Sequence, residues 1–269
     1  MKAYAAVLVL GVPLWVGARQ QSSTTRAGWP CGARVDASYF QMAEGTGGHL
    51  LLLAPEEIGD SAALLTAFDS HRQTIFRLAG SLNPGVHEFQ VPIDSTVDSA
   101  VFSISVQCLQ LAEVIPPSGG FANREAVTDL SNFRAERMVI VTQPERGVWT
   151  LRVSGSGIGG IVVQARSAIG IGRVEFAAAH STGFDARPSP GVENTVRVRV
   201  SGDVTDVKAS IVNGALKRIA PLPRQAGETG DVYVSRFTPG AEGFRLLVVG
   251  KDTEGFGFQR MSAPLIRAR

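Results

Sequence analysis

Residues 87–94 read HEFQVPID and residues 101–108 read VFSISVQC, and both stretches alternate between apolar and polar side chains. Such alternation places successive side chains on opposite faces of a β-strand. We therefore expect two strands that each bury one face. The expected buried faces carry His87, Phe89, Val91 and Ile93 in the first stretch and Phe102, Ile104, Val106 and Cys108 in the second.

The alternation recurs along the chain, for example in VRVRV at residues 196–200, with Gly, Pro and Asn turns between the strands. Short half-buried strands at such intervals are typical of antiparallel β-sandwiches. We expect a mainly β fold of two tandem antiparallel sandwiches. The first, over residues 72–180, is expected to be jelly-roll or galactose-binding-like, and the second, over residues 195–269, immunoglobulin- or fibronectin-like. A linker without periodicity, STGFDARPSPGVEN at 181–194, is expected between them.

A small α/β segment is expected before the sandwiches, within residues 19–71. The stretch ASYFQMAEG at 37–45 predicts a helix that stops at Gly45, and GGHLLLLA after it predicts a buried strand. Pro55 then opens a second helix, because proline and the two glutamates that follow suit a first helical turn.

The apolar side chains of this segment need a partner surface. A helical period places Ile58, Ala62, Leu65 and Phe68 on one face of the second helix. Each large apolar side chain left exposed forgoes about 1.5–3 kcal/mol. We therefore expect Leu50 to Leu53, together with Leu65 and Phe68, to dock against the first sandwich.

The first 18 residues have the pattern of a secretory signal peptide. Met1-Lys2 is cationic, the residues from Ala3 to Val16 are almost all apolar, and small residues precede a cleavage point after Ala18. The apolar run is shorter than the roughly 20 residues that span a bilayer. We expect the signal to be removed and the mature protein to be secreted or periplasmic, without a membrane span.

Charge and composition exclude some classes of protein. The chain has 26 Lys and Arg against 24 Asp and Glu, a formal charge of +2, and so lacks the one-sided field of nucleic-acid binders. With four His and two Cys, and without an H-E-x-x-H or calcium-loop motif, no metal or other cofactor is expected. Asp94, Asp98 and Asp129 lie in or near loops as candidates for calcium, although such carboxylates are usually only solvated.

Two patterns resemble catalytic or cofactor motifs without their context. Gly155–Gly160 matches G-x-G-x-x-G, but a strand-like stretch follows where a dinucleotide site needs a helix, so we interpret it as a hairpin turn. A Ser-His-Asp set lacks a nucleophile elbow, and triads are defined by geometry. The residues available for such a set are Asp60, Asp69, Ser70, His71, His87 and Ser95.

Three residues are singled out as structural markers. Cys31 and Cys108 would enter an oxidising compartment, where they either form a disulfide or leave Cys108 as a small buried residue. Trp149 follows a Pro/Gly turn and shares its phase with Leu151 and Val153, which favours a core position over a sugar-stacking platform.

The segment PERGVWTLRVSGSGIGGIVVQARS at 144–167 resembles the stretch that follows the von Willebrand factor A domain in hemicentin and related extracellular proteins. GVHEFQVPIDSTVDSAVFSISVQ at 85–107 resembles the first strands of that sandwich, and YVSRFTPGAEGFRLLVVGKDTEGFGFQRMS at 233–262 the immunoglobulin-like segment that follows it. The stretches YFQMAEGTGGHLLLL and PEEIGDSAALLTAF resemble the last helix, strand and helix of the A domain. The resemblance covers about residues 36–265, in the same order.

The chain departs from the A-domain pattern at the metal-binding motif. An A domain holds its metal through D-x-S-x-S, whereas this chain has only Asp36-Ala37-Ser38, so metal-dependent adhesion is not implied. The resemblance implies a non-catalytic extracellular protein that acts in surface adhesion or protein interaction, with an extracellular protein or a glycan as partner. A carbohydrate-binding or enzyme-accessory module and a secreted hydrolase with a dispersed active site are the alternatives.

Overall fold

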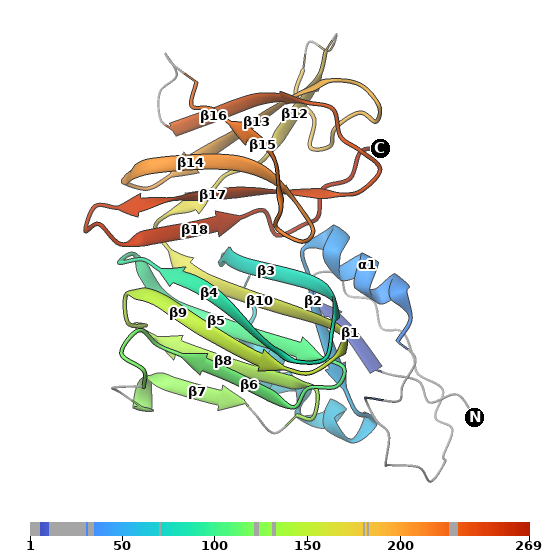
Figure 1. Cartoon of the computed structure of the whole chain (residues 1–269), viewed down its shortest axis with the longest axis vertical. Helices are drawn as coiled ribbons and strands as arrows, with labels where there is room; N and C mark the ends of the chain where they lie inside the picture. Colours follow the sequence, from blue (N-terminus) through green and yellow to red (C-terminus); the bar gives the residue numbers. More distant parts are fainter. Residues whose placement is uncertain are drawn as a thin grey trace.

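The computed structural model describes residues 6–10, 31, 35–69, 71–120, 124–130, 133–179, 181, 183–225 and 231–269. Its strands pair antiparallel throughout. Two β-sandwiches lie one above the other along the long axis, and a small helical segment flanks the first (Figure 1). The expected mainly β fold class is confirmed.

The first sandwich has jelly-roll topology. A five-stranded sheet in the order β3-β10-β5-β8-β7 faces a three-stranded sheet in the order β4-β9-β6. Successive strands cross from one sheet to the other, as in jelly rolls, except β7 and β8, which pair with each other in the five-stranded sheet. The strands are β3 (Gln73–Leu82), β4 (Val86–Ile93), β5 (Val97–Val106), β6 (Leu111–Ile115), β7 (Val127–Leu130), β8 (Glu136–Thr142), β9 (Gly147–Ser154) and β10 (Gly157–Ser167).

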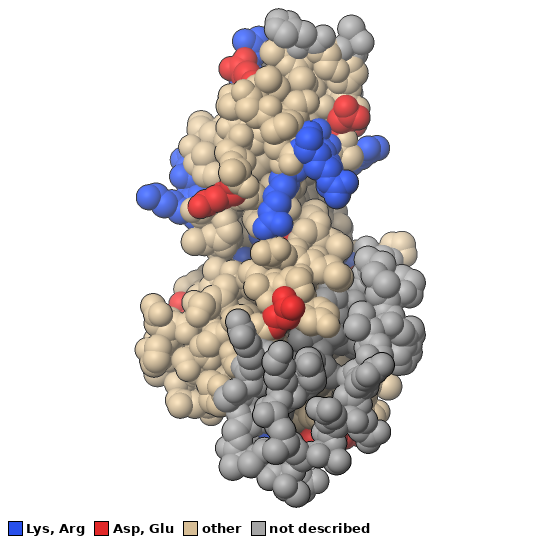
Figure 2. All heavy atoms as spheres, turned by 90° about the vertical axis from the view of Figure 1, so that its right-hand side faces the viewer, with Lys and Arg blue, Asp and Glu red and all other residues tan. Residues whose placement is uncertain are grey.

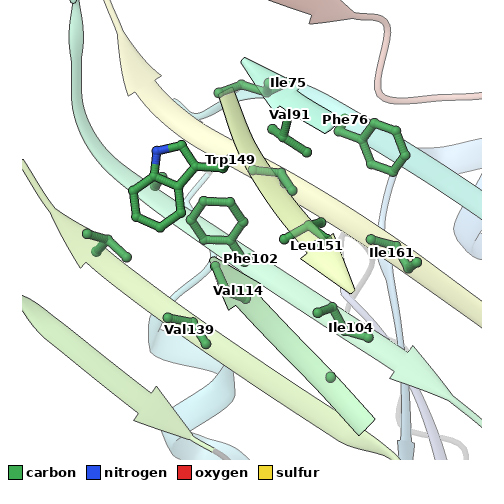
Figure 3. Close-up of a cluster of buried hydrophobic side chains, with 14 of the residues drawn as sticks. Ile75, Phe76, Val91, Phe102, Ile104, Val114, Val139, Trp149, Leu151 and Ile161 are labelled. Atoms are coloured by element: carbon green, nitrogen blue, oxygen red, sulfur yellow. The ribbon is translucent and has the colours of Figure 1, made fainter. Parts of the chain in front are cut away.

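Trp149 lies in the core between these sheets, beside Phe102 (Figure 3). Its ring stacks on Phe102 of the opposite sheet, with 5.1 Å between ring centroids. The indole Nε1 donates a hydrogen bond to the carbonyl oxygen of Glu145, 2.8 Å away, so the one polar atom of the side chain is paired inside an apolar cluster. The turn before the strand therefore both delivers and anchors the tryptophan.

The glycine-rich stretch at 155–160 does not close a hairpin, which corrects our interpretation. It connects β9 to β10, and these strands lie in opposite sheets. A Cβ atom on Gly155 would stand 2.6 Å from the carbonyl oxygen of Cys108, and one on Gly159 would stand 2.7 Å from that of Ser105. The glycines are needed because the chain passes this close to neighbouring backbone.

The N-terminal segment covers the outer face of the five-stranded sheet. It consists of β1 (Ala6–Leu10), α1 (Ala37–Thr46), β2 (His49–Leu53), the 3-10 helix η1 (Pro55–Asp60) and α2 (Ser61–Thr66). Leu51 and Leu53 pack with Val101 and Met138, which confirms the expected docking of this segment. The outward face of β5 is consequently buried.

The second helix buries other residues than the 3.6-residue period predicted. Residues 55–60 form a 3-10 helix, which has three residues per turn, so a 3.6-residue period counted from Ile58 fails beyond it. Leu64 is the buried leucine, whereas Ile58 and Leu65 are exposed and Phe68 is half-buried. The first helix ends at Thr46 instead of Gly45, because Gly47 takes the left-handed conformation (φ 76°) that caps it.

The second sandwich has the strand order of a fibronectin-like domain. One sheet places β13 between β12 and β16, with the short β11 also on β13, and the other has the order β15-β14-β17-β18. They enclose a second core. The strands are β11 (Gly170–Ile171), β12 (Glu175–Ala178), β13 (Asn194–Ser201), β14 (Val204–Asn213), β15 (Arg218–Leu222), β16 (Asp231–Phe237), β17 (Phe244–Asp252) and β18 (Gly257–Met261).

Strand β12 was expected in the first sandwich, but it belongs to the second. It pairs with β13, and its Phe176 packs in the second core. Residues 181–194 therefore connect two strands of the second sandwich instead of linking the two sandwiches. The chain crosses between them in the short step from β10 to β11, where Ile169 is already buried in the second core.

A buried ion pair ties the two sandwiches together beside this crossing. Arg260 Nη2 of β18 donates to Asp94 Oδ2, 2.7 Å away, and both side chains are fully buried. The same guanidinium donates through Nε to the carbonyl oxygen of Ile169 at 2.9 Å. Gln259 donates to the carbonyl oxygen of Ile75 on β3, so β18 lies against the edge of the first sandwich. The joint is thus built from specific polar contacts.

Candidate functional site

A cluster of buried charges joins three parts of the molecule. Glu44, at the end of α1, accepts a hydrogen bond from Arg77 Nε of β3 at 2.9 Å and pairs through its other oxygen with Arg245 of β17. Arg77 also donates to the carbonyl oxygens of Ala43 and Gly47. Burial lowers the pKa of Arg77, and it lowers the pKa of Arg245 to about 10 against the pull of Glu44. We name Glu44, Arg77 and Arg245 the junction triad.

Two further titratable groups lie buried under the N-terminal segment. Burial, with the nearby positive charge of Arg77, lowers the pKa of His49 to about 3, and its Nε2 lies 3.2 Å from Gln164 Oε1. Burial raises the pKa of Glu136 to about 8 despite a hydrogen bond from Ser103 Oγ at 2.9 Å. Both groups are therefore uncharged near neutral pH.

This buried polar region has no room for a substrate. The void beside His49 and the junction triad has a volume of about 10 Å³. A void of that size holds about one water molecule. We interpret the region as the polar seal between the N-terminal segment and the two sandwiches.

Cys31 and Cys108 are joined in a disulfide, with 4.7 Å between their Cα atoms. Cys108 lies in the turn after β5 instead of on the apolar face of the strand, because β5 ends at Val106. The bond attaches the chain before α1 to the first sandwich. Such bonds persist in oxidising compartments and are rare in the cytosol.

We expect the exported protein to contain no free thiol. Alkylation without reductant should add no mass to the intact protein, whereas alkylation after reduction should modify both Cys31 and Cys108. Intact-mass spectrometry measures this directly. Two alkylated thiols before reduction would contradict the bond.

The sequence candidates for catalysis and calcium do not assemble. His87 Nε2 lies 2.9 Å from the carbonyl oxygen of Asn83, and Asp69 pairs with Arg166, while Ser70 lies outside the described residues. Asp94 is the buried partner of Arg260, so it is not a loop carboxylate in solvent. Within the described ranges, no three His, Cys, Asp or Glu side chains gather in a way that would hold a metal ion.

The outer face of the three-stranded sheet carries exposed apolar side chains at both ends. Val86 of β4 and Leu111 of β6 flank Ser154 of β9 at one end, and Val148 of β9 stands beside Pro92 at the other. Val86, Leu111 and Val148 are 62%, 39% and 52% exposed. Single exposed apolar side chains are common on protein surfaces, whereas their gathering on one face is a feature of interaction sites.

The charges on this face are paired with one another. Arg152, in the middle of β9, donates to Glu88 on β4 at 2.8 Å and to Glu113 on β6 at 3.1 Å. These two hydrogen bonds raise the pKa of Arg152. The paired charges hold the side chains in a fixed pattern between the apolar ends. We name the outward residues of β4, β9 and β6 the outer sheet face.

One residue of this face, Val148, can be recognised from the sequence. Val148 lies between Gly147 and Trp149, so it has the opposite phase to the core tryptophan and must point outward. Val86 and Leu111 stand at the starts of their strands, where the alternation had too few residues to show a phase. An apolar residue in the polar phase indicates either an exposed contact or a face that another element covers, as at Val101, and the exposure of Val148 shows that it is the first.

A shallow groove of about 340 Å³ opens in the second sandwich between β14, β15 and β16. Pro221 and Pro223 line it, and proline blunts a strand edge because it has no N–H to donate. Tyr233 also lines the groove but is buried, and burial together with Asp231 raises its pKa. Trp149 is buried as well and Trp29 lies outside the described residues, so neither Trp149 nor Tyr233 offers an exposed sugar-stacking ring.

Charge is divided unevenly between the two halves of the chain. Residues 31–168 carry 9 Lys and Arg against 14 Asp and Glu, whereas residues 169–269 carry 14 against 10. Figure 2 shows Lys and Arg side chains gathered on the second sandwich. The near-neutral total therefore conceals an acidic first half and a basic second half.

The chain is similar to two long curated proteins, and no family model matches it. It is 28% identical over 195 residues to Hemicentin-1 of Mus musculus and 26% identical over 197 residues to Hemicentin-1 of Homo sapiens. Each alignment covers 68% of this chain and 3% of the relative, so the chain spans only a small part of either protein. The similarity is that of a distant hemicentin-like region.

Two solved structures show weak likeness. A Bacillus licheniformis lipase in its propeptide form has a TM-score of 0.39 at 13% identity, covering 76% of this chain and 44% of the lipase. A DUF4785 family protein of Legionella pneumophila has a TM-score of 0.40 at 13% identity, covering 73% of this chain and 64% of that protein. Likenesses of this size carry no argument about function. Among the described helices, none has the length and apolar character to cross a membrane.

Proposed function

We propose that this chain is a non-catalytic interaction module of an extracellular protein, and that the outer sheet face is its contact surface. The observation that carries the proposal is this face, with apolar side chains at both ends and paired charges between them. The disulfide and the similarity to Hemicentin-1 support an extracellular setting. A glycan partner receives no such support, because Trp149 and Tyr233 are buried.

We further propose how the chain is processed and how it divides into domains. Residues 1–18 are a signal peptide that is removed during export, and residues 35–69 dock on the first sandwich as one unit with it. Two sandwich domains follow, with the division near Ile169, so that β11 and β12 fall in the second. The origin of the N-terminal segment as the end of a von Willebrand factor A domain stays a prediction.

The face predicts which substitutions abolish binding. Val86→Lys with Leu111→Lys places two charges on the outer sheet face without touching a core, so we expect folding to be kept and binding to weaken at least tenfold. The measurement is binding of the labelled protein, residues 19–269, to intact source cells and to their extracellular matrix. Ile219→Lys on β15, where the side chain is 50% exposed, is the matched control and should bind normally.

Equal binding by the double variant and the wild type would exclude the outer sheet face. Absence of binding by every form would overturn adhesion itself, and turnover in a hydrolase activity screen would overturn the non-catalytic assignment. Where the protein binds, a photo-crosslinker placed at Leu111 should attach to the partner, which mass spectrometry then identifies. Thermal unfolding of each variant verifies that the fold is intact.

A further inference from the structure

Strand β2 pairs with β1, a strand close to the N-terminus. Its hydrogen-bonding edge is occupied by β1, which pairs with it antiparallel in a continuous register from Ala6 opposite Leu53 to Leu10 opposite His49 (Figure 1). Strand β1 is part of the segment with the signal-peptide pattern. Removal of residues 1–18 therefore takes away the strand that covers β2.

The two faces of β2 are held by the rest of the molecule. Leu51 and Leu53 pack into one apolar cluster, and Leu50 and Leu52 pack into another with α1 and Ala135. Leu52 N also donates to Ser105 Oγ of the sheet beneath at 3.0 Å. Strand β2 is thus fixed in place by contacts other than β1, and the position of β1 is a slot beside an anchored strand.

We infer that, in the mature protein, this slot beside β2 binds an extended apolar strand of a partner polypeptide by antiparallel pairing. The inference rests on the signal removal of the proposed function. The partner chemistry follows from the segment that occupies the slot, AVLVL, whose five residues are all apolar. Unpaired N–H and C=O groups on an otherwise buried strand favour an incoming strand, and the main chain supplies the affinity as in other β-augmented complexes.

The test uses the mature protein, residues 19–269 with the disulfide formed. The probe is a peptide of residues 3–12 with a solubilising lysine tag. Its matched control carries Leu8→Pro, which keeps the apolar composition but removes a backbone donor and disfavours strand pairing. Hydrogen exchange is measured by NMR at the amides of Leu51 and Leu53, which face the slot because the intervening Leu52 amide points away from it to Ser105.

We expect these amides to exchange quickly in the mature protein alone, and to slow at least tenfold with the apolar peptide but not with the proline peptide. Slow exchange without peptide, with the protein either monomeric or dimeric, would show that its own residues or a second copy fill the slot and would overturn the inference. Equal effects of the two peptides would overturn it too. Intact mass of the exported protein tests signal removal separately, so failure of the proposed processing is distinguishable from failure of the slot.

Discussion

Glu44→Ala should lower the free energy of unfolding by about 3–5 kcal/mol, because it leaves the guanidinium groups of Arg77 and Arg245 buried without their shared carboxylate. Their mutual repulsion would add to the loss. Urea unfolding at 25 °C and pH 6 measures the change. A loss below 1 kcal/mol would show that the junction triad does not hold the N-terminal segment against the sandwiches.

The matched control is Glu254→Ala, which breaks the ion pair with Arg146 on the surface. Both side chains are about half exposed, so we expect a change of at most about 1 kcal/mol. A second variant separates charge from volume: replacing Glu44, Arg77 and Arg245 together by methionine removes every buried charge of the triad. We expect it to recover much of the stability lost in Glu44→Ala, since apolar replacement of a buried charge cluster is often neutral or better.

The second large effect is on pH dependence and comes from Glu136. Its pKa is about 8 in the folded protein and 4.5 unfolded, so between these values the folded state holds a proton that the unfolded state has lost. Stability therefore falls as pH rises from 4.5 to 8. At about 1.4 kcal/mol per pH unit, the fall between pH 6.5 and 8 is about 2 kcal/mol.

His49 gives the opposite slope at lower pH. Its pKa is about 3 folded and 6.5 unfolded, so below 6.5 the unfolded state gains a proton that the folded state does not. The contribution of His49 to stability is complete above pH 6.5 and is lost as the pH falls toward 3. Between pH 4.5 and 6.5 the opposite slopes of His49 and Glu136 cancel. The combined contribution of these two groups to the free energy of unfolding is therefore greatest in that pH range.

Glu136→Gln tests this directly, because an amide has nearly the shape of the protonated acid and keeps an acceptor for Ser103. Unfolding at pH 6, 7 and 8.5 should show the variant losing less stability than the wild type as pH rises, by about 2 kcal/mol. Equal pH profiles for the two proteins would mean that Glu136 titrates near its ordinary pKa. His49 remains in both proteins, so its slope cancels in the comparison.

Alternation along single strands was enough to predict two sandwiches, but not which surfaces they bury. Ser103 and Ser105 have the polar phase of β5 and yet lie buried, because β2, about 50 residues earlier, docks over them. Likewise Phe176 shows an apolar phase without showing which core it enters. Local period reveals that a face is apolar, whereas the partner of that face is a matter of tertiary packing.

The candidate site was less accessible to sequence reasoning. Cys31 and Cys108 are 77 residues apart, and spacing alone does not pair them. Nor does any motif join Glu44, Arg77 and Arg245, which come from a helix and from two different sandwiches. The exposed phase of Val148 was readable beside Trp149, but Val86 and Leu111 needed the strand register to place them on the same face.

The position of α1 gives the molecule a mechanical property. Leu265 N donates to the carbonyl oxygen of Glu44, and Gly47 lies against Ala263, so the start and the end of the described fold meet at the junction triad. Tension applied between α1 and residues 263–269 would load this meeting point directly, together with Ile266, which packs in the second core and pairs with Phe244. The buried ion pairs of Glu44 would then share the load with the apolar contacts of the second sandwich.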